Sequence, residues 1–106
     1  MLPKRRRLSA YEVREVLKRG RTVRDTHLSM KFAKAEGSMR AAVVVQKSIA
    51  TRAVERNRLR RAVYRALSTL PTPTGARVVF FVQKIPVTPL ARAFATEAQG
   101  LLKKIS

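Results

Sequence analysis

The segment from Arg52 to about Leu70 has the hydrophobic pattern of an amphipathic helix. At about 100° per residue, its apolar side chains gather on one side with the i, i+3, i+4, i+7 spacing of a core-facing stripe. The stripe contains Leu59, Ala62, Val63, Ala66, Leu67 and Leu70. The other side contains Asn57, Arg60, Arg61, Tyr64 and Arg65, with Arg56 and Arg58 at its margins. The pattern predicts one face anchored in a core and one arginine-rich face.

Helical patterns also occur near both ends of the chain. The first predicted helix has Ser9 as its N-cap and runs to Arg19, with Gly20 as the stop. The last has Thr88 as a cap and Pro89 at the first helical position. Its apolar seam consists of Leu90, Phe94, Ala98, Leu101 and Ile105.

Between the helices, three segments have strand patterns. Residues 26–34 alternate between apolar and polar positions, which predicts a strand with one buried face. Residues 40–46 contain the continuous apolar run 41–45, and residues 76–83 contain the run 78–82, so both are predicted as central strands. The predicted fold is a small two-layer α+β sandwich with a mixed sheet.

The charge of the chain changes the interpretation of the arginine-rich helix. The 106 residues form one predicted domain, 1–106, and carry 24 Lys+Arg against 6 Asp+Glu, a net charge of +18. The helix itself has six arginines and one carboxylate, Glu55, whereas solvated helix faces normally interleave both signs. Arginine also suits bidentate contact with phosphate. Together with a basic arm at residues 1–7, this predicts nucleic-acid binding.

The sequence offers little for catalysis by the chain itself. The carboxylates are scattered, and Glu12 and Glu15 are spaced to pair with basic residues on the first helix. His27 has Asp25 nearby and could act as a general base, although a lone surface histidine is more often incidental. The four glycines stand far apart, which argues against a phosphate-binding loop. We predict no catalytic residue and no metal site in the protein.

The cysteine content and the hydropathy of the chain indicate its cellular compartment. The chain has no cysteine, which excludes disulfides and fits a reducing cytosol. No apolar run approaches the length of a membrane span, and the basic start lacks the apolar stretch of a signal peptide. The expected location is the cytoplasm.

The order of motifs resembles the protein subunit of bacterial ribonuclease P. That family carries an Arg-Asn-Arg motif with further basic residues on a helix, as in residues 56–61 and Arg65 here. Before the motif the family has a valine-rich strand, a lysine and an Ala-Val pair, which match residues 43–45, Lys47 and residues 53–54. The remaining matches are Arg7-Leu8, the helix stop at Gly20, and Gln83-Lys84 after the last strand.

The resemblance implies the element order α-β-β-β-α-β-α, with a left-handed crossover around the arginine-rich helix. It implies a non-catalytic protein subunit of an endoribonuclease whose catalytic RNA removes the 5′ leader from precursor tRNA. Mg²⁺ would be held mainly by that RNA. The implied partners are the catalytic RNA and precursor tRNA, with no membrane and no protein partner.

The resemblance also implies two RNA-contacting regions. The catalytic RNA would be contacted by Lys47, Arg56, Asn57, Arg58, Arg60, Arg61 and Arg65, none of which performs bond chemistry. The leader would lie in a cleft between the first helix and the sheet. Positions that are often aromatic in the family hold Val13, Leu17 and Lys31 here. Lys31 could meet a leader phosphate, and plain core packing is an alternative role for Val13 and Leu17.

Two other functions are compatible with parts of the sequence. A structural RNA-binding protein, such as a ribosomal component, would share the basic helix and the α+β core. Asn57 between arginines and the identity of the co-purifying RNA separate it from a ribonuclease P subunit. A protein-only nuclease would use His27 and Asp25, and it would lose activity on substitution of His27.

Overall fold

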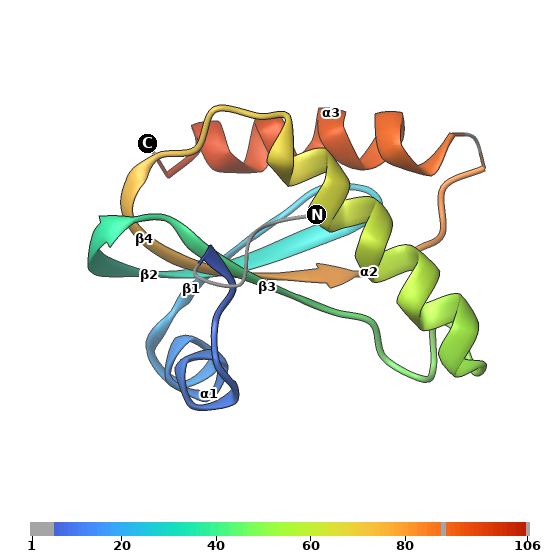
Figure 1. Ribbon diagram of the computed structural model, residues 1–106, viewed down its shortest axis with the longest axis horizontal. Helices are drawn as coiled ribbons and strands as arrows, with labels where there is room; N and C mark the ends of the chain where they lie inside the picture. Colours follow the sequence, from blue (N-terminus) through green and yellow to red (C-terminus); the bar gives the residue numbers. More distant parts are fainter. Residues whose placement is uncertain (1–5, 88, 106) are drawn as a thin grey trace.

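The computed structural model describes residues 6–87 and 89–105. Along this part of the chain the elements are α1 (Ala10–Arg19), β1 (Arg21–Arg24), β2 (Leu28–Ser38), β3 (Arg40–Val44), α2 (Ala53–Ser68), β4 (Thr74–Val82) and α3 (Leu90–Lys103). The order α-β-β-β-α-β-α is confirmed. Helices α2 and α3 cover one face of the sheet and α1 covers the other (Figure 1), so there are three layers where two were predicted.

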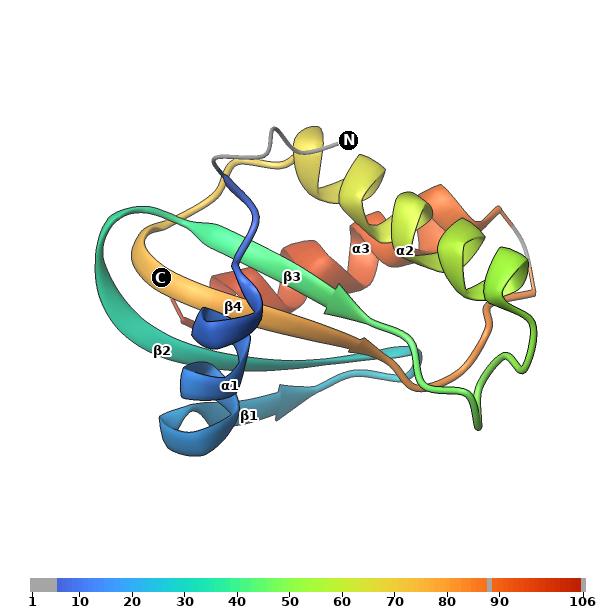
Figure 2. The same cartoon turned by 60° about the horizontal axis from the view of Figure 1, so that its bottom comes forward.

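The sheet is mixed, as predicted, with the strand order β1-β2-β4-β3. β2 pairs antiparallel with β1 and with β4, whereas β3 and β4 are parallel. Parallel neighbours need a crossover, which α2 supplies behind the sheet in Figure 2. The crossover is left-handed (Figure 2), against the ordinary right-handed preference.

One strand prediction is wrong, and one strand is missing from the predicted set. β4 is central, but β3 lies at the edge of the sheet. Its apolar run reflects coverage of both faces, because Val43 belongs to the core under α2 while Ala42 belongs to the core under α1. The hydrophobic pattern does not predict β1, because only Val23 of this four-residue strand is even partly buried.

The N-terminal segment covers part of the β3 edge. The Leu8 backbone N–H donates to the Ala41 carbonyl at 2.9 Å, and Arg7 forms an isolated parallel bridge with Ala41. Arg6 donates from Nη2 to Thr72 Oγ1 at 2.9 Å. The rest of the expected basic arm, residues 1–5, lies outside the described residues.

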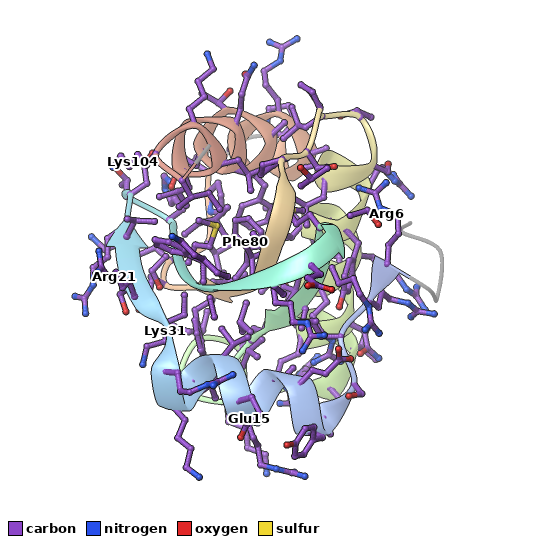
Figure 3. The ribbon with its side chains drawn as sticks, turned by 90° about the vertical axis from the view of Figure 1, so that its left-hand side faces the viewer. Arg6, Glu15, Arg21, Lys31, Phe80 and Lys104 are labelled. Atoms are coloured by element: carbon purple, nitrogen blue, oxygen red, sulfur yellow. The ribbon has the colours of Figure 1, made fainter. Side chains whose placement is uncertain are left out.

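The main core fills the space between the sheet and the α2–α3 layer. Phe80 points into this space from β4 (Figure 3) and is fully buried, as is Phe94 of α3. The predicted stripe of α2 is confirmed, with Leu59, Val63, Ala66 and Leu67 buried and Ala62 and Leu70 partly buried. The predicted seam of α3 is confirmed in the same way.

A second, smaller core lies under α1. Val16 of α1 packs against Ala42 and Val79 on the opposite face of the sheet from Phe80. The start of α1 is confirmed at Ser9, whose hydroxyl accepts from the Glu12 backbone N–H at 3.2 Å while Glu12 Oε1 accepts from the Ser9 N–H at 3.0 Å.

Gly20 ends α1 because the chain passes very close to β2. A Cβ at this position would lie 2.5 Å from the Val16 carbonyl oxygen and 2.9 Å from that of Phe32. The start of α3 differs by one residue from the prediction, since Pro89 is the N-cap residue and Leu90 the first helical one. The predicted cap, Thr88, lies outside the described residues.

Candidate nucleic-acid interface

The outer side of α2 presents guanidinium groups that the protein leaves available. Arg61 and Arg65 are exposed, and the guanidinium group of neither has a hydrogen-bond or ion-pair partner within residues 6–87 and 89–105. Arg58 lies 3.8 Å from Glu55, and its side chain is 61% exposed. An exposed pair of this kind is strongly screened by solvent. A negatively charged ligand could therefore engage all three arginines.

Asn57 and Arg60 act together on the same helix. Arg60 donates from Nη2 to the side-chain oxygen of Asn57, one turn earlier on α2. Asn57 is exposed, and this contact uses its acceptor while its amide N–H groups stay available as donors. The pair offers a cation and a neutral donor to one ligand.

Arg56 supports the loop that precedes α2. Its Nη1 donates to the carbonyl oxygens of Ala50 at 3.1 Å and Thr51 at 2.7 Å. The helix otherwise begins without a side-chain cap at Arg52. The same loop carries Lys47, which is exposed. Arg56 thus uses Nη1 to hold this loop, and Lys47 projects from the loop.

Tyr64 does not belong with the arginines, where the sequence pattern placed it. Its ring packs against the main core, and its hydroxyl accepts from the Val43 backbone N–H at 3.2 Å. Burial raises the pKa of Tyr64 above its ordinary value of 10, against the opposing effects of the Val43 hydrogen bond and of Arg7 and Arg60. Tyr64 therefore fixes the position of α2 on the edge strand β3.

A groove of about 510 Å³ runs between α2 and the start of α3. It is lined by Val54, Arg58, Arg61, Ala62, Arg65, Leu90 and Ala91. Three predicted RNA-contacting arginines thus share one concave surface. Arg60 lies elsewhere, close enough to Tyr64 to affect the titration of its hydroxyl.

The predicted leader-cleft residues lie at the α1 side of the sheet. Lys31 donates from Nζ to the Leu17 carbonyl at 3.0 Å, so these two residues are brought together. Leu17 is 37% exposed, whereas Val13 is half-buried against the second core. Val13 therefore makes a core-packing contact, which is the alternative role that the sequence suggested for it.

Sequence reasoning missed Phe81 on this face of the sheet. Its register partners are Ser29 on β2 and Val44 on β3, and both Phe81 and Val44 are only partly buried. The continuous run 78–82 hides which residues face which side. The alternation of side chains along a strand would have placed Phe81 opposite Phe80, and hence toward α1.

Glu12 links α1 to cations of the sheet instead of pairing along its own helix as predicted. Its Oε2 lies 2.5 Å from Arg40 Nη1 and 3.5 Å from Arg77 Nη2. Hydrogen bonding by Ser9, followed by Arg40 and Arg77, holds the pKa of Glu12 below its ordinary value despite partial burial. Glu15 does pair within the helix, 3.9 Å from Arg19.

His27 has a structural partner that the sequence did not suggest. Its Nδ1 lies 2.5 Å from Glu97 Oε2 on α3. Glu97 Oε1 also accepts from the backbone N–H groups of His27 at 2.7 Å and Leu28 at 3.0 Å. Asp25 instead accepts from the Thr26 N–H. The buried Glu97 carboxylate therefore ties α3 to the start of β2, and the suggested His27–Asp25 pair is not formed.

The described residues contain neither a cluster of metal-binding side chains nor a membrane-spanning helix. Residues 6–87 and 89–105 contain no group of three or more His, Cys, Asp or Glu side chains that could hold a metal ion. In the same ranges, no helix has the length and apolar character needed to cross a membrane.

Comparison with known proteins identifies the family. The family model described as Ribonuclease P matches residues 2–106. The RNase P protein from Thermotoga maritima aligns with a TM-score of 0.82 and 22% identity, over 94% of this chain and 97% of that chain. The Staphylococcus aureus RNase P protein aligns with a TM-score of 0.78 and 14% identity, over 95% of each chain. No curated protein matches. This chain therefore belongs to the Ribonuclease P family, as a ribonuclease P protein subunit.

Proposed function

We propose that this chain binds the catalytic RNA of ribonuclease P through the outer side of α2. The observation that carries the proposal is the availability of the Arg61 and Arg65 guanidinium groups, which have no partner within the described residues. Like charges on one helix repel one another, and phosphates would remove this cost. Arg58, Arg60, Asn57, Arg56 and Lys47 would extend the contact along α2 and its preceding loop.

We further propose that the 5′ leader of precursor tRNA lies along the α1 side of the sheet. Leu17 and Lys31 meet there, and Phe81 and Val44 add a partly exposed apolar surface. A base stacked on an aromatic ring gains about 1–3 kcal/mol, so Phe81 can replace part of what Val13 and Leu17 do not supply. Lys31 would contact a leader phosphate.

The chemistry of cleavage would belong to the RNA. The described carboxylates form no metal-binding group, and Glu12 and Glu97 are engaged in contacts within the protein. The ligands of Mg²⁺ would therefore come mainly from the RNA. The role of the chain is to neutralise phosphates, which lowers the concentration of Mg²⁺ that the folded RNA and its bound substrate need. We propose that it does so in the cytoplasm.

A reconstitution experiment tests this function. The purified chain alone should leave precursor tRNA intact, and it should increase cleavage when added to the cognate catalytic RNA at low Mg²⁺. Absence of stimulation would refute the proposal. The RNA that co-purifies from the native cell separates this function from a ribosomal one, because recovery of ribosomal RNA alone would favour the latter.

A further inference from the structure

A second basic pocket lies at the edge of the sheet that is farther from α2. It has a volume of about 400 Å³ and is lined by Arg19, Arg21, Phe32, Ala33 and Lys34. β1 is the edge strand on this side, whereas α2 lies beside the other edge strand, β3. Figure 3 accordingly shows Arg21 at one side of the molecule and α2 at the other.

The fold forces the three cations of this pocket together. Because Gly20 lacks a side chain, the chain can turn directly against the Phe32 backbone, and Arg19 and Arg21 are placed on both sides of that contact. Arg21 is the register partner of Phe32. Lys34 follows two residues later on β2 and so projects from the same face of the sheet as Phe32. Arg21 and Lys34 thus project from the face that carries Phe32, and Arg19 lines the same pocket from the end of α1.

The protein does little to neutralise these charges. The charged side-chain groups of Arg21 and Lys34 have no hydrogen-bond or ion-pair partner in the part of the chain that the structure describes. Arg19 lies 3.9 Å from Glu15, but its side chain is 72% exposed. A contact of that length and exposure neutralises little of the charge of Arg19.

Ordinary structural roles account for only part of the arrangement. A cation in the last turn of a helix is favoured by the helix dipole, which explains Arg19. A charged residue protects an edge strand from pairing with another chain, which explains Arg21. Lys34 lies diagonally across from Arg21 on the same face, and like charges in neighbouring positions cost stability. An anion held between them would offset that cost.

We propose that this pocket binds a backbone phosphate of RNA, as a third RNA contact separate from α2 and from the proposed leader surface. The guanidinium groups of Arg19 and Arg21 can bind phosphate oxygens in the bidentate mode, and Lys34 adds a point charge. The pocket and α2 lie at opposite edges of the sheet, in a molecule that measures 35 × 25 × 24 Å. This proposal rests on the proposed ribonuclease P function.

The test compares the salt dependence of binding for three forms of the full chain. These are the wild type, the pocket variant Arg21→Ala/Lys34→Ala, and the control variant Arg14→Ala/Lys18→Ala. Arg14 and Lys18 are exposed on α1 outside the pocket, so the control removes the same formal charge. Each form is titrated with the catalytic RNA, and each reconstituted holoenzyme with precursor tRNA, over a series of KCl concentrations. Thermal unfolding confirms that all forms fold.

The slope of log affinity against log salt gives the result. Loss of one phosphate contact should lower its magnitude by about 0.7 for a single strand or 0.9 for a duplex, in one of the two titrations. The titration that changes identifies the RNA that supplies the phosphate, and the control should match the wild type in both. Unchanged slopes for the pocket variant, or an equal loss in the control, would overturn the proposal. The proposed function fails separately, if the wild type itself does not stimulate cleavage.

Discussion

The hydroxyl of Tyr64 on α2 accepts a hydrogen bond from the backbone N–H of Val43 on β3, with the two heavy atoms 3.2 Å apart. This contact joins the arginine-bearing helix to the edge of the sheet and occupies a donor on that edge. The orientation of the arginine face therefore depends on a residue that itself points inward.

Substitution of Tyr64 by Phe should destabilise the protein by about 1–3 kcal/mol, because the buried Val43 N–H loses its partner. The difference in free energy of unfolding between the wild type and this variant should become smaller at alkaline pH. The raised pKa of Tyr64 favours the protonated hydroxyl in the folded state, so its contribution is complete below pH 10 and declines as pH rises above 10. Denaturant unfolding of both forms between pH 7 and pH 11 measures the difference. A constant difference across this range would contradict the assignment.

Substitution of Glu12 by Gln should cost about 1–3 kcal/mol near neutral pH, because Arg40 loses a charged acceptor in a mostly buried contact. The lowered pKa of Glu12 means that its contribution is present above its ordinary value of 4.5 and is lost as pH falls below it. The gap between wild type and variant should therefore narrow in acid.

The matched control is Glu15→Gln, whose partner Arg19 is 3.9 Å away and exposed, and whose effect should stay within about 0.5 kcal/mol. Chemical denaturation of the three forms at pH 7 and pH 3 gives both comparisons. An equal cost for both substitutions would mean that the Arg40 contact contributes no more than a surface pair.

Two glycine-to-alanine substitutions should have opposite effects. At Gly20 a Cβ would lie 2.5 Å from the Val16 carbonyl oxygen, so overpacking should cost about 1–3 kcal/mol. At Gly100, inside α3, a Cβ meets nothing within 4 Å, and alanine should stabilise the helix by about 0.5–1 kcal/mol. Thermal unfolding reports both. A stabilised Gly20→Ala variant would refute the close approach of α1 to β2.

Removal of the Glu97 carboxylate should be costly because two backbone N–H groups depend on it. Glu97→Ala leaves those of His27 and Leu28 without an acceptor, at a cost of about 2 kcal/mol or more. Glu97→Gln keeps an acceptor for them and should be milder. Denaturant unfolding gives the free energy of unfolding of each variant, and Thr96→Ala, at the neighbouring exposed position, is the control. Equal stability of the Ala and Gln variants would argue against this role.

Periodicity predicted the parts of the fold in which a single face is buried. The stripe of α2 and the seam of α3 could be found in this way because residues such as Leu59 and Phe94 repeat at helical spacing. The edge position of β3 could not, because a strand covered on both faces by separate cores has the same apolar run as a central strand. β1 is too short and too charged to stand out.

The candidate interface divides in a similar way. The arginine face could be predicted because an unbalanced charge on one side of a helix is visible in the sequence. Contacts between distant segments could not, and these include Tyr64 with Val43, Glu12 with Arg40 and His27 with Glu97. The pocket around Phe32 belongs to the same group, since it depends on the register of β1 and β2 and on the close approach at Gly20.

The most direct test of the central claim is the salt dependence of binding to the catalytic RNA for Arg61→Ala and Arg65→Ala, with Arg92→Ala on α3 as an exposed control. Each α2 variant should bind more weakly, and the magnitude of its slope of log affinity against log salt should fall by about 0.7–0.9, the value for one phosphate. Asn57→Ala should reduce affinity with little change in slope, because an amide carries no charge. Slopes equal to the wild type for both arginine variants would show that α2 does not contact the phosphates of this RNA.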